Sequence, residues 1–219
     1  MGYNVAIDGP AGAGKSTIAK LVAKEKGFIY VDTGAMYRGL AVYFLKKGLK
    51  KADVPGIIEA CRDAEVTISY DNGIQQVYLN GENVTRLLRT EEVGNMASHI
   101  SAIPEVRQKL LELQRSLASE QNVIMDGRDI GTNILPGADV KIYLTASVET
   151  RANRRYRELK EKGEPCDLEK ITKDIRERDE RDMNRETAPL KQADDAILID
   201  SSDMTIQEVV SKICSYCNI

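Results

Sequence analysis

Short apolar runs alternate along the chain with longer stretches in which apolar side chains recur every three or four positions. The short runs predict buried strands and the longer stretches predict amphipathic helices, an alternation typical of an α/β fold with a parallel sheet. Predicted strands lie near residues 3–7, 28–31, 123–126, 140–144 and 196–199. Predicted helices, with their capping residues, lie near 15–26, 35–47, 53–63, 91–101, 104–119, 147–162, 167–184 and from 205 onward.

One segment departs from this alternation. Residues 65–70 and 75–79 are rich in β-forming side chains and are joined by Asp71-Asn72-Gly73, and Asn80-Gly81 marks a second tight turn. Asn-Gly pairs favour the left-handed turns of hairpins, so this segment predicts a small antiparallel sheet. We therefore expect one α/β core carrying two insertions. The expected core comprises residues 1–33, 100–150 and 167–219, and the insertions are 34–99 and 151–166.

The composition narrows the functional classes. The 219 residues suit one domain, and a net charge of −3 gives no support for general nucleic-acid binding, which needs a basic surface. The first ten residues lack the basic segment of a signal peptide, and no stretch approaches the roughly 18 apolar residues of a membrane-spanning helix. We expect a cytoplasmic monomer with no membrane or nucleic-acid partner. The C-x-x-C pair Cys214 and Cys217 is expected to consist of reduced, half-buried thiols.

The most specific motif follows the first predicted strand. Residues 9–16 read Gly-Pro-Ala-Gly-Ala-Gly-Lys-Ser, which fits the pattern G-x-x-x-x-G-K-[ST] between a strand and a helix. Glycines let backbone N–H groups turn inward around a phosphate, and the helix N-terminus adds partial positive charge. Lys15 would reach the β- and γ-phosphates, and the Ser16 hydroxyl would ligate Mg²⁺. The loop predicts that the chain binds a nucleoside triphosphate.

Folds with this loop also need an acidic residue at a strand end to hold the water shell of the metal. Asp126, which ends the apolar run 123–125, fits this role best. Asp8, directly before the loop, is a second candidate.

Other motifs indicate a phosphoryl transferase. A GTPase should carry Asn-Lys-x-Asp and an ABC-type ATPase should carry Leu-Ser-Gly-Gly-Gln, and the sequence contains neither. Arginine instead recurs near glycine or acidic residues in the segments 32–38, 126–129 and 151–157. Because the planar guanidinium can bind phosphate through two N–H groups, arginines that converge on one cleft predict a second, phosphorylated ligand.

Four motifs in this order resemble the bacterial cytidylate kinase family. They are Ile7-Asp8-Gly9-Pro10, Asp-Thr-Gly-Ala-Met-Tyr-Arg at 32–38, Asp-Gly-Arg-Asp-Ile-Gly-Thr at 126–132, and Glu-Arg-Asp-Glu-Arg-Asp-Met-Asn-Arg at 177–185. The resemblance covers nearly the whole chain, including the β-rich insertion of the bacterial form. It implies an α/β fold of the P-loop NTPase type, with a five-stranded parallel sheet flanked by helices, a nucleoside-monophosphate-binding insertion with a small antiparallel sheet, and a short helical lid. The implied reaction transfers the γ-phosphate of ATP to CMP or dCMP, with Mg²⁺.

The resemblance also implies roles for individual residues. The implied ATP-binding residues are Gly9, Pro10, Ala11, Gly12, Ala13, Gly14, Lys15, Ser16, Thr17 and the lid residue Arg151. The implied CMP-binding residues are Thr33, Arg38, Ser98, Arg107, Arg128, Asp129, Arg178, Asp182 and Arg185. Within this second set, Arg38 and Arg128 would meet the phosphate and Arg178 and Asp182 the sugar, while Ser98, Arg107, Asp129 and Arg185 would surround cytosine. The expected catalytic residues are Lys15, Arg128, Arg154 and Arg155. Thr33 stands where many members of the family have serine, and it keeps the hydroxyl.

Two other functions stay open from the sequence. A small-metabolite kinase on the same core would phosphorylate an alcohol and would need a general base, for which Asp32 is the candidate. A non-catalytic nucleotide-sensing module would use the loop only to bind. The one histidine, His99, is expected to be an ordinary helix side chain, because transfer between phosphates needs positioning and charge neutralisation rather than a base.

Overall fold

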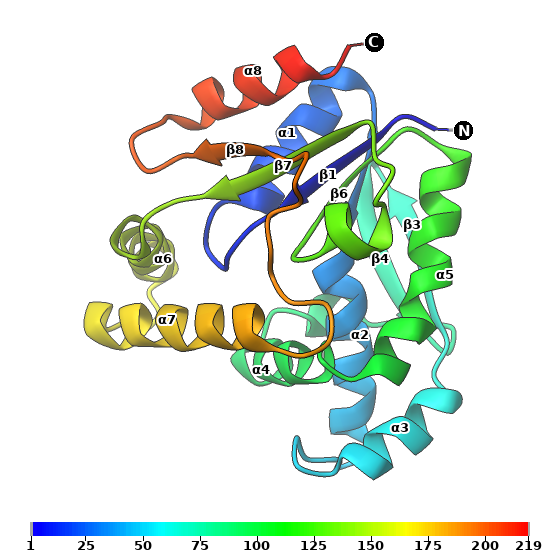
Figure 1. The fold of residues 1–219 in the computed structure, drawn as a ribbon. Helices are drawn as coiled ribbons and strands as arrows, with labels where there is room; N and C mark the ends of the chain where they lie inside the picture. Colours follow the sequence, from blue (N-terminus) through cyan, green and yellow to red (C-terminus); the bar gives the residue numbers. More distant parts are fainter. Residues whose placement is uncertain (1, 219) are drawn as a thin grey trace.

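The computed structural model describes residues 2–218, and five parallel strands form its central sheet in the order β2-β6-β1-β7-β8 (Figure 1). The strands are β1 (Asn4–Asp8), β2 (Ile29–Asp32), β6 (Val123–Gly127), β7 (Val140–Thr145) and β8 (Ile197–Asp200). The five predicted strands are therefore confirmed, each to within a residue or two. Because β1 lies in the middle of the sheet, the loop that follows it emerges at the centre of the edge formed by the carboxyl ends of the strands.

Helices cover both faces of this sheet, which explains why its strands read as continuous apolar runs. Val5 and Ile7 of β1 pack with α1 (Lys15–Lys26) and α8 (Ile206–Tyr216). Ala6, which points to the opposite face, belongs to a core shared with α2 (Thr33–Lys46), α4 (Glu91–Ile100) and α5 (Pro104–Glu120). Figure 1 shows α1 and α8 above the sheet and α2, α4 and α5 below or beside it.

The predicted antiparallel sheet is also confirmed, with a third strand that the sequence did not indicate. Its order is β3-β4-β5, formed by β3 (Val66–Asp71), β4 (Ile74–Leu79) and β5 (Glu82–Asn83). Asn72 and Gly73 have φ of 50° and 76°, the left-handed conformations of a tight hairpin turn. A strand of two residues, such as β5, is too short to leave an alternating pattern in the sequence. The helix α3 (Val54–Arg62) precedes this sheet and the turn η1 (Thr85–Leu87) follows it.

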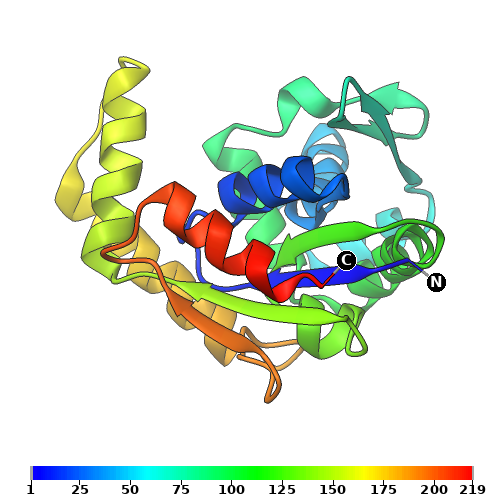
Figure 2. The same ribbon diagram turned by 90° about the horizontal axis from the view of Figure 1, so that it is seen from above.

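Two charged helices, α6 (Val148–Glu161) and α7 (Leu168–Asn184), pack together. In Figure 2, α6 stands away from the sheet at the left, whereas α7 runs behind the strands. The predicted caps are present, because Ser147 accepts from the Thr150 N–H and Asp167 accepts from the Lys170 N–H. A π-helical turn, η2 (Ile130–Ile134), follows β6 and has no counterpart among the predicted elements.

The start of α2 lies two residues before the predicted one. Asp32 ends β2 and at once caps α2, with Oδ1 accepting from the N–H of Ala35 at 2.8 Å. One residue thus ends a strand and begins a helix, and the chain turns without a separate loop.

No helix within residues 2–218 is both long and apolar enough to cross a membrane. The four cysteines are free, and burial raises the pKa of the Cys214 thiol to about 11.

Candidate active site at the carboxyl ends of the strands

The loop between β1 and α1 has the backbone of a phosphate cradle. Gly12 and Gly14 have φ of 76° and 87°, a region that residues with a Cβ rarely adopt. A Cβ at Gly9 would also collide with the carbonyl oxygen of Leu144 in the neighbouring strand. The motif glycines therefore meet two separate demands, a left-handed backbone and a close approach to β7.

Lys15 lies inside this loop with only 5% of its surface exposed. Its ammonium donates to the carbonyl oxygen of Pro10 at 2.8 Å, and no carboxylate within residues 2–218 lies at ion-pair distance from it. Burial lowers the pKa of Lys15, and the nearby Arg128 lowers it further. A buried cation without a counter-ion favours an incoming anion, since the anion would supply the missing charge.

Three aspartates end neighbouring strands at this edge, and each has a different set of partners. Asp126 of β6 accepts from the Ser16 hydroxyl at 2.9 Å and from the Tyr30 hydroxyl at 2.7 Å, and burial raises its pKa. Asp8 of β1 instead accepts from the backbone N–H groups of Ile130 and Gly131 at 2.8 and 2.7 Å. Of the two candidates for a metal-holding acid, Asp126 is thus the one beside Ser16.

The third of these aspartates, Asp32, has both oxygens engaged. One accepts from the N–H of Ala35, and the other pairs with the guanidinium of Arg38 at 2.9 Å. Thr33, the next residue, donates its hydroxyl to the carbonyl oxygen of Asp126 at 2.8 Å and so ties the end of β2 to the end of β6.

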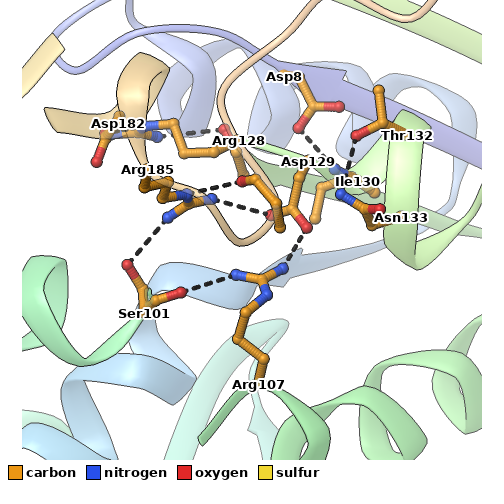
Figure 3. Close-up of polar contacts among 12 residues, drawn as sticks. Asp8, Ser101, Arg107, Arg128, Asp129, Ile130, Thr132, Asn133, Asp182 and Arg185 are labelled. Carbon is orange, nitrogen blue, oxygen red and sulfur yellow. Dashed lines mark hydrogen bonds and ion pairs between the residues drawn. The ribbon is translucent and has the colours of Figure 1, made fainter. Parts of the chain in front are cut away.

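A second group of charged side chains surrounds the segment that follows β6 (Figure 3). Arg128 Nε pairs with Asp182 of α7 at 2.9 Å. Asp129 lies between two arginines: Arg107 of α5 donates to Oδ2, and Arg185 Nη2 lies 3.5 Å from Oδ1. Burial raises the pKa of Asp129, and both arginines oppose that shift. Four elements thus build one charged cluster from residues far apart in the sequence.

The three expected lid arginines differ in their surroundings. Arg151 is buried, donating to the Ala11 carbonyl oxygen of the loop at 2.8 Å and pairing with Asp179 at 2.7 Å. Arg154 donates to the carbonyl oxygen of Ser201, at the end of β8, at 2.7 Å. Arg155 is about half exposed and pairs with Glu158 one turn along α6. Arg151 and Arg154 therefore connect α6 to the loop, to α7 and to the end of β8, whereas the ion pair of Arg155 lies within α6 itself.

A single cavity of about 860 Å³ joins the loop to the charged cluster. Every catalytic, ATP-binding and CMP-binding residue expected from the sequence lines this cavity except Gly9 and Pro10, the first two residues of the loop, and the second acid candidate Asp8 does not line it. Four buried side-chain atoms on its wall have no hydrogen-bond partner among residues 2–218: Tyr37 Oη, Arg38 Nε, Arg178 Nε and Arg185 Nη2. A buried polar group left without a partner costs about 1–3 kcal/mol, so this set of free donors indicates a polar ligand. Burial also lowers the pKa of Arg178, to about 10.

The cavity wall also includes residues that the motifs did not single out. Ser101 lies one helical turn after Ser98, a spacing that places both on one face of α4, and this periodicity could have suggested it. Ser201 follows the carboxyl end of β8, where ligand-binding residues of parallel sheets collect. Arg89, Glu158 and the start of α8 complete the wall without a signal in the sequence.

Comparison with known proteins agrees with this geometry. The sequence profile of the family described as cytidylate kinase matches residues 5–219. A protein named cytidylate kinase from Caldicellulosiruptor saccharolyticus is 51% identical over 210 residues, which cover 96% of this chain and 93% of that protein. A second, from Carboxydothermus hydrogenoformans, is 48% identical over 209 residues, covering 95% of this chain and 94% of that protein. The crystal structure of an uncharacterized protein from Eubacterium ventriosum matches with a TM-score of 0.50 and 15% identity, covering 99% of this chain and 98% of that one, a likeness of fold alone.

Proposed function

The chain belongs to the cytidylate kinase family, and we propose that it transfers the γ-phosphate of ATP to the phosphate of CMP or dCMP. The products are ADP and CDP or dCDP. The observation that carries this function is the single cavity in which an uncompensated lysine on a phosphate loop faces a pocket of paired arginines and aspartates.

On the ATP side, the loop from Gly9 to Thr17 holds the triphosphate through its backbone N–H groups and the N-terminus of α1. When ATP binds, the Lys15 ammonium leaves the Pro10 carbonyl oxygen and donates to the β- and γ-phosphates instead. Arg151 supports the loop by donating to the Ala11 carbonyl oxygen. Arg154 lies beside the loop and donates to the carbonyl oxygen of Ser201, the residue after β8.

Ser16 at the start of α1 and Asp126 near the end of β6 fit a bound Mg²⁺. Ser16 and Asp126 offer one hydroxyl and one carboxylate oxygen side by side, which are the hard ligands this ion prefers. Within residues 2–218 no cluster of three or more acidic, histidine or cysteine side chains forms a metal cage. Mg²⁺ generally keeps several waters and takes other ligands from substrate phosphates, so Asp126 would hold the ion through water. When bound, Mg²⁺ would neutralise charge on the β- and γ-phosphates.

On the acceptor side, Arg38 and Arg128 hold the CMP phosphate while Asp32 and Asp182 fix their guanidinium planes. Arg178 and Asp182 lie at the sugar, and Asp129, with Ser98, Arg107 and Arg185, reads the base. Thr33 orients the end of β6, next to Arg128. Since each arginine carries five N–H donors, the one or two that it spends on a carboxylate leave others for the ligand.

In the reaction, an oxygen of the CMP phosphate forms a bond to the γ-phosphorus as the bond from that phosphorus to the β-bridging oxygen breaks. ADP leaves with the electron pair of the broken bond. The acceptor oxygen is already anionic, so no general base is required, and Lys15, Arg128, Arg154 and Arg155 stabilise the charge of the transferring group. Closure of residues 151–166 over the phosphates would exclude water, which would otherwise accept the phosphoryl group.

A small-metabolite kinase fits the site less well than a CMP kinase. Its candidate general base, Asp32, already accepts from the Ala35 N–H and the Arg38 guanidinium through its two oxygens. A module that only senses nucleotide would not need a pocket of paired arginines beside its loop.

The experiment that tests the function measures ADP release with CMP, dCMP, UMP, AMP, GMP and simple alcohols as acceptors, with and without Mg²⁺. We expect turnover with CMP and dCMP well above the other acceptors, and dependence on Mg²⁺. Turnover with an alcohol but not with CMP would support the metabolite kinase. ATP binding without any turnover would support the sensing module.

A further inference from the structure

Ser101 connects three parts of the proposed acceptor pocket: the end of α4, α5 and the residue that follows α7. It is the C-cap residue that directly follows α4, and the chain turns there toward α5. Arg107 of α5 donates from Nη1 to the Ser101 carbonyl oxygen at 3.0 Å, and Arg185, just after α7, donates from Nη1 to the Ser101 hydroxyl at 3.1 Å. These are the two arginines that flank Asp129, and Figure 3 shows Ser101 between them.

The hydroxyl of Ser101 is itself oriented. It donates its proton to the Ser98 carbonyl oxygen, one turn back along α4, at 2.9 Å. A serine hydroxyl has one proton and two lone pairs, so the lone pairs are left for Arg185. The contact from Arg185 to Ser101 thus has a fixed direction, set by the end of α4.

This contact decides which atom of Arg185 stays available. Its Nε donates to the Ala188 carbonyl oxygen at 2.7 Å and its Nη1 to Ser101, so two of the three guanidinium nitrogens are held. The third, Nη2, is buried, has no hydrogen-bond partner within residues 2–218, and lies 3.5 Å from Asp129 Oδ1. A free donor and a carboxylate acceptor therefore stand next to each other on the wall of the cavity.

We propose that Ser101 is a positioning residue for recognition of the acceptor base, holding Arg185 so that its Nη2 and the Asp129 carboxylate form a fixed donor–acceptor pair. The inference rests on the proposed function. Cytosine presents an amino donor at C4 next to an acceptor at N3, which complements this pair. Uracil presents an acceptor at C4 and a donor at N3, which opposes it. Discrimination against UMP requires a fixed Arg185, because a mobile guanidinium would turn away from uracil and avoid the unfavourable contact.

The test compares Ser101→Ala with wild type, measuring kcat and KM for CMP, UMP and ATP. Removing the hydroxyl leaves the backbone carbonyl that holds Arg107, so Arg185 alone is released. We expect KM for CMP to rise about 10-fold, the scale of one lost hydrogen bond to a charged group, with kcat and KM for ATP within about 2-fold of wild type. The CMP/UMP ratio of kcat/KM should fall about 5-fold, since Arg185 also opposes uracil less well once it is free.

Three further variants separate positioning from general stability. Ser101→Thr keeps the hydroxyl and should restore most of the CMP affinity. Ser101→Cys keeps a side chain of similar volume, but its sulfur is only a weak acceptor. It should therefore raise KM for CMP and lower the CMP/UMP ratio as Ser101→Ala does, and it gives this result independently if the alanine variant folds poorly. Ser119→Ala is the matched control, because Ser119 makes the same backward bond, to the Ser116 carbonyl oxygen at 2.8 Å, on the exposed end of α5.

The outcomes distinguish this inference from the proposed function. If wild type fails to phosphorylate CMP, the proposed function is wrong and this inference falls with it. If wild type phosphorylates CMP but Ser101→Ala and Ser101→Cys keep its KM and its CMP/UMP ratio, only the role of Ser101 is refuted. A loss that Ser101→Thr does not rescue, or that changes KM for ATP equally, would also refute it.

Discussion

The phosphate loop and the proposed acceptor pocket share one cavity but are built in opposite ways. The loop is contiguous, from Gly9 to Thr17, and its donors are backbone N–H groups together with Lys15, which forms no ion pair with a carboxylate in the described part of the chain. The acceptor pocket draws its side chains from α2, α4, α5, the segment after β6 and α7, and its cations are compensated in pairs such as Arg38 with Asp32.

This difference follows from how each half holds an anion. A turn of glycines can point several N–H groups at one spot without charge, so the loop needs no counter-ion to fold. Several arginines gathered from distant elements repel one another, and burial without partners would be costly. Asp32, Asp129 and Asp182 relieve that cost and also fix the directions of the guanidinium groups. Changes in the loop should therefore affect the rate of transfer, and changes in the pocket should affect the choice of acceptor.

The largest effect is expected from Lys15→Met. The substitution keeps the length and apolar stem of the side chain but removes the only buried charge in the loop. We expect kcat to fall by at least ~10²-fold, as when one preorganised electrostatic contact is lost. Lys24→Met, on the exposed side of the same helix, is the control and should leave kcat unchanged. Steady-state ADP release checks this, and near-normal kcat in a folded Lys15→Met variant would refute the mechanism.

The next prediction concerns the arginines of α6, which we group with the phosphate loop because Arg154 lies beside Gly14. Replacing Arg154 and Arg155 together by alanine should lower kcat roughly 10- to 100-fold while KM for CMP changes less than about 3-fold. Arg154→Ala alone should account for most of the loss, because Arg154 stands against the loop whereas Arg155 pairs with Glu158. Arg157→Ala, exposed on the same helix, is the control. A change confined to CMP affinity would move these arginines to the acceptor side.

A third prediction tests whether the pocket sets the choice of base. Asp129→Asn removes the carboxylate that would accept from the cytosine amino group and supplies an amide that can donate to uracil. The CMP/UMP ratio of kcat/KM should drop by at least ~10-fold, about 1.4 kcal/mol of lost discrimination. Asp174→Asn, on the exposed face of α7, should leave the ratio unchanged. If both variants keep the wild-type ratio, Asp129 does not read the base.

The smallest effect links the two regions through Asp8, which ends the strand before the loop yet holds the backbone of Ile130 and Gly131 next to Asp129. Burial raises the pKa of Asp8 to about 6, while those two N–H groups oppose the shift. Above this pH the carboxylate accepts from both groups. Below it the added proton removes one acceptor, so the segment carrying Arg128 and Asp129 should loosen.

Asp8→Asn has one acceptor at every pH and should therefore mimic the protonated state. We expect KM for CMP in this variant to be about 5-fold above wild type at pH 8 and to approach the wild-type value near pH 5.5. The ratio of the two KM values is the informative quantity, since the phosphate of CMP itself titrates near pH 6 and affects both enzymes equally. A ratio that does not change with pH would mean that Asp8 has no such role.

Much of the fold could be predicted from the sequence because its signals are local. The five strands of the sheet, the helix after the loop and the caps at Ser147, Asp167 and Thr205 each depend on a few neighbouring residues. Elements without such a signal were missed: β5 is two residues long, and the π-helical turn η2 depends on Asp8, which is more than a hundred residues away in the sequence. The division of the chain into core, insertion and lid stays a prediction.

The sequence by itself determined the phosphate loop, since the spacing of Gly9, Gly14, Lys15 and Ser16 is the whole of its chemistry. It also placed most of the arginines and aspartates of the pocket in the family motifs at 32–38, 126–132 and 177–185, whereas Arg107 lies outside them. Only the tertiary structure decided how these charges pair: that Asp126 and not Asp8 stands beside Ser16, that Asp129 lies between Arg107 and Arg185, and that Ser101 joins those two arginines. The physical reason is that a backbone turn is fixed by the residues within it, whereas an ion pair is fixed by the packing of the elements that carry its two partners.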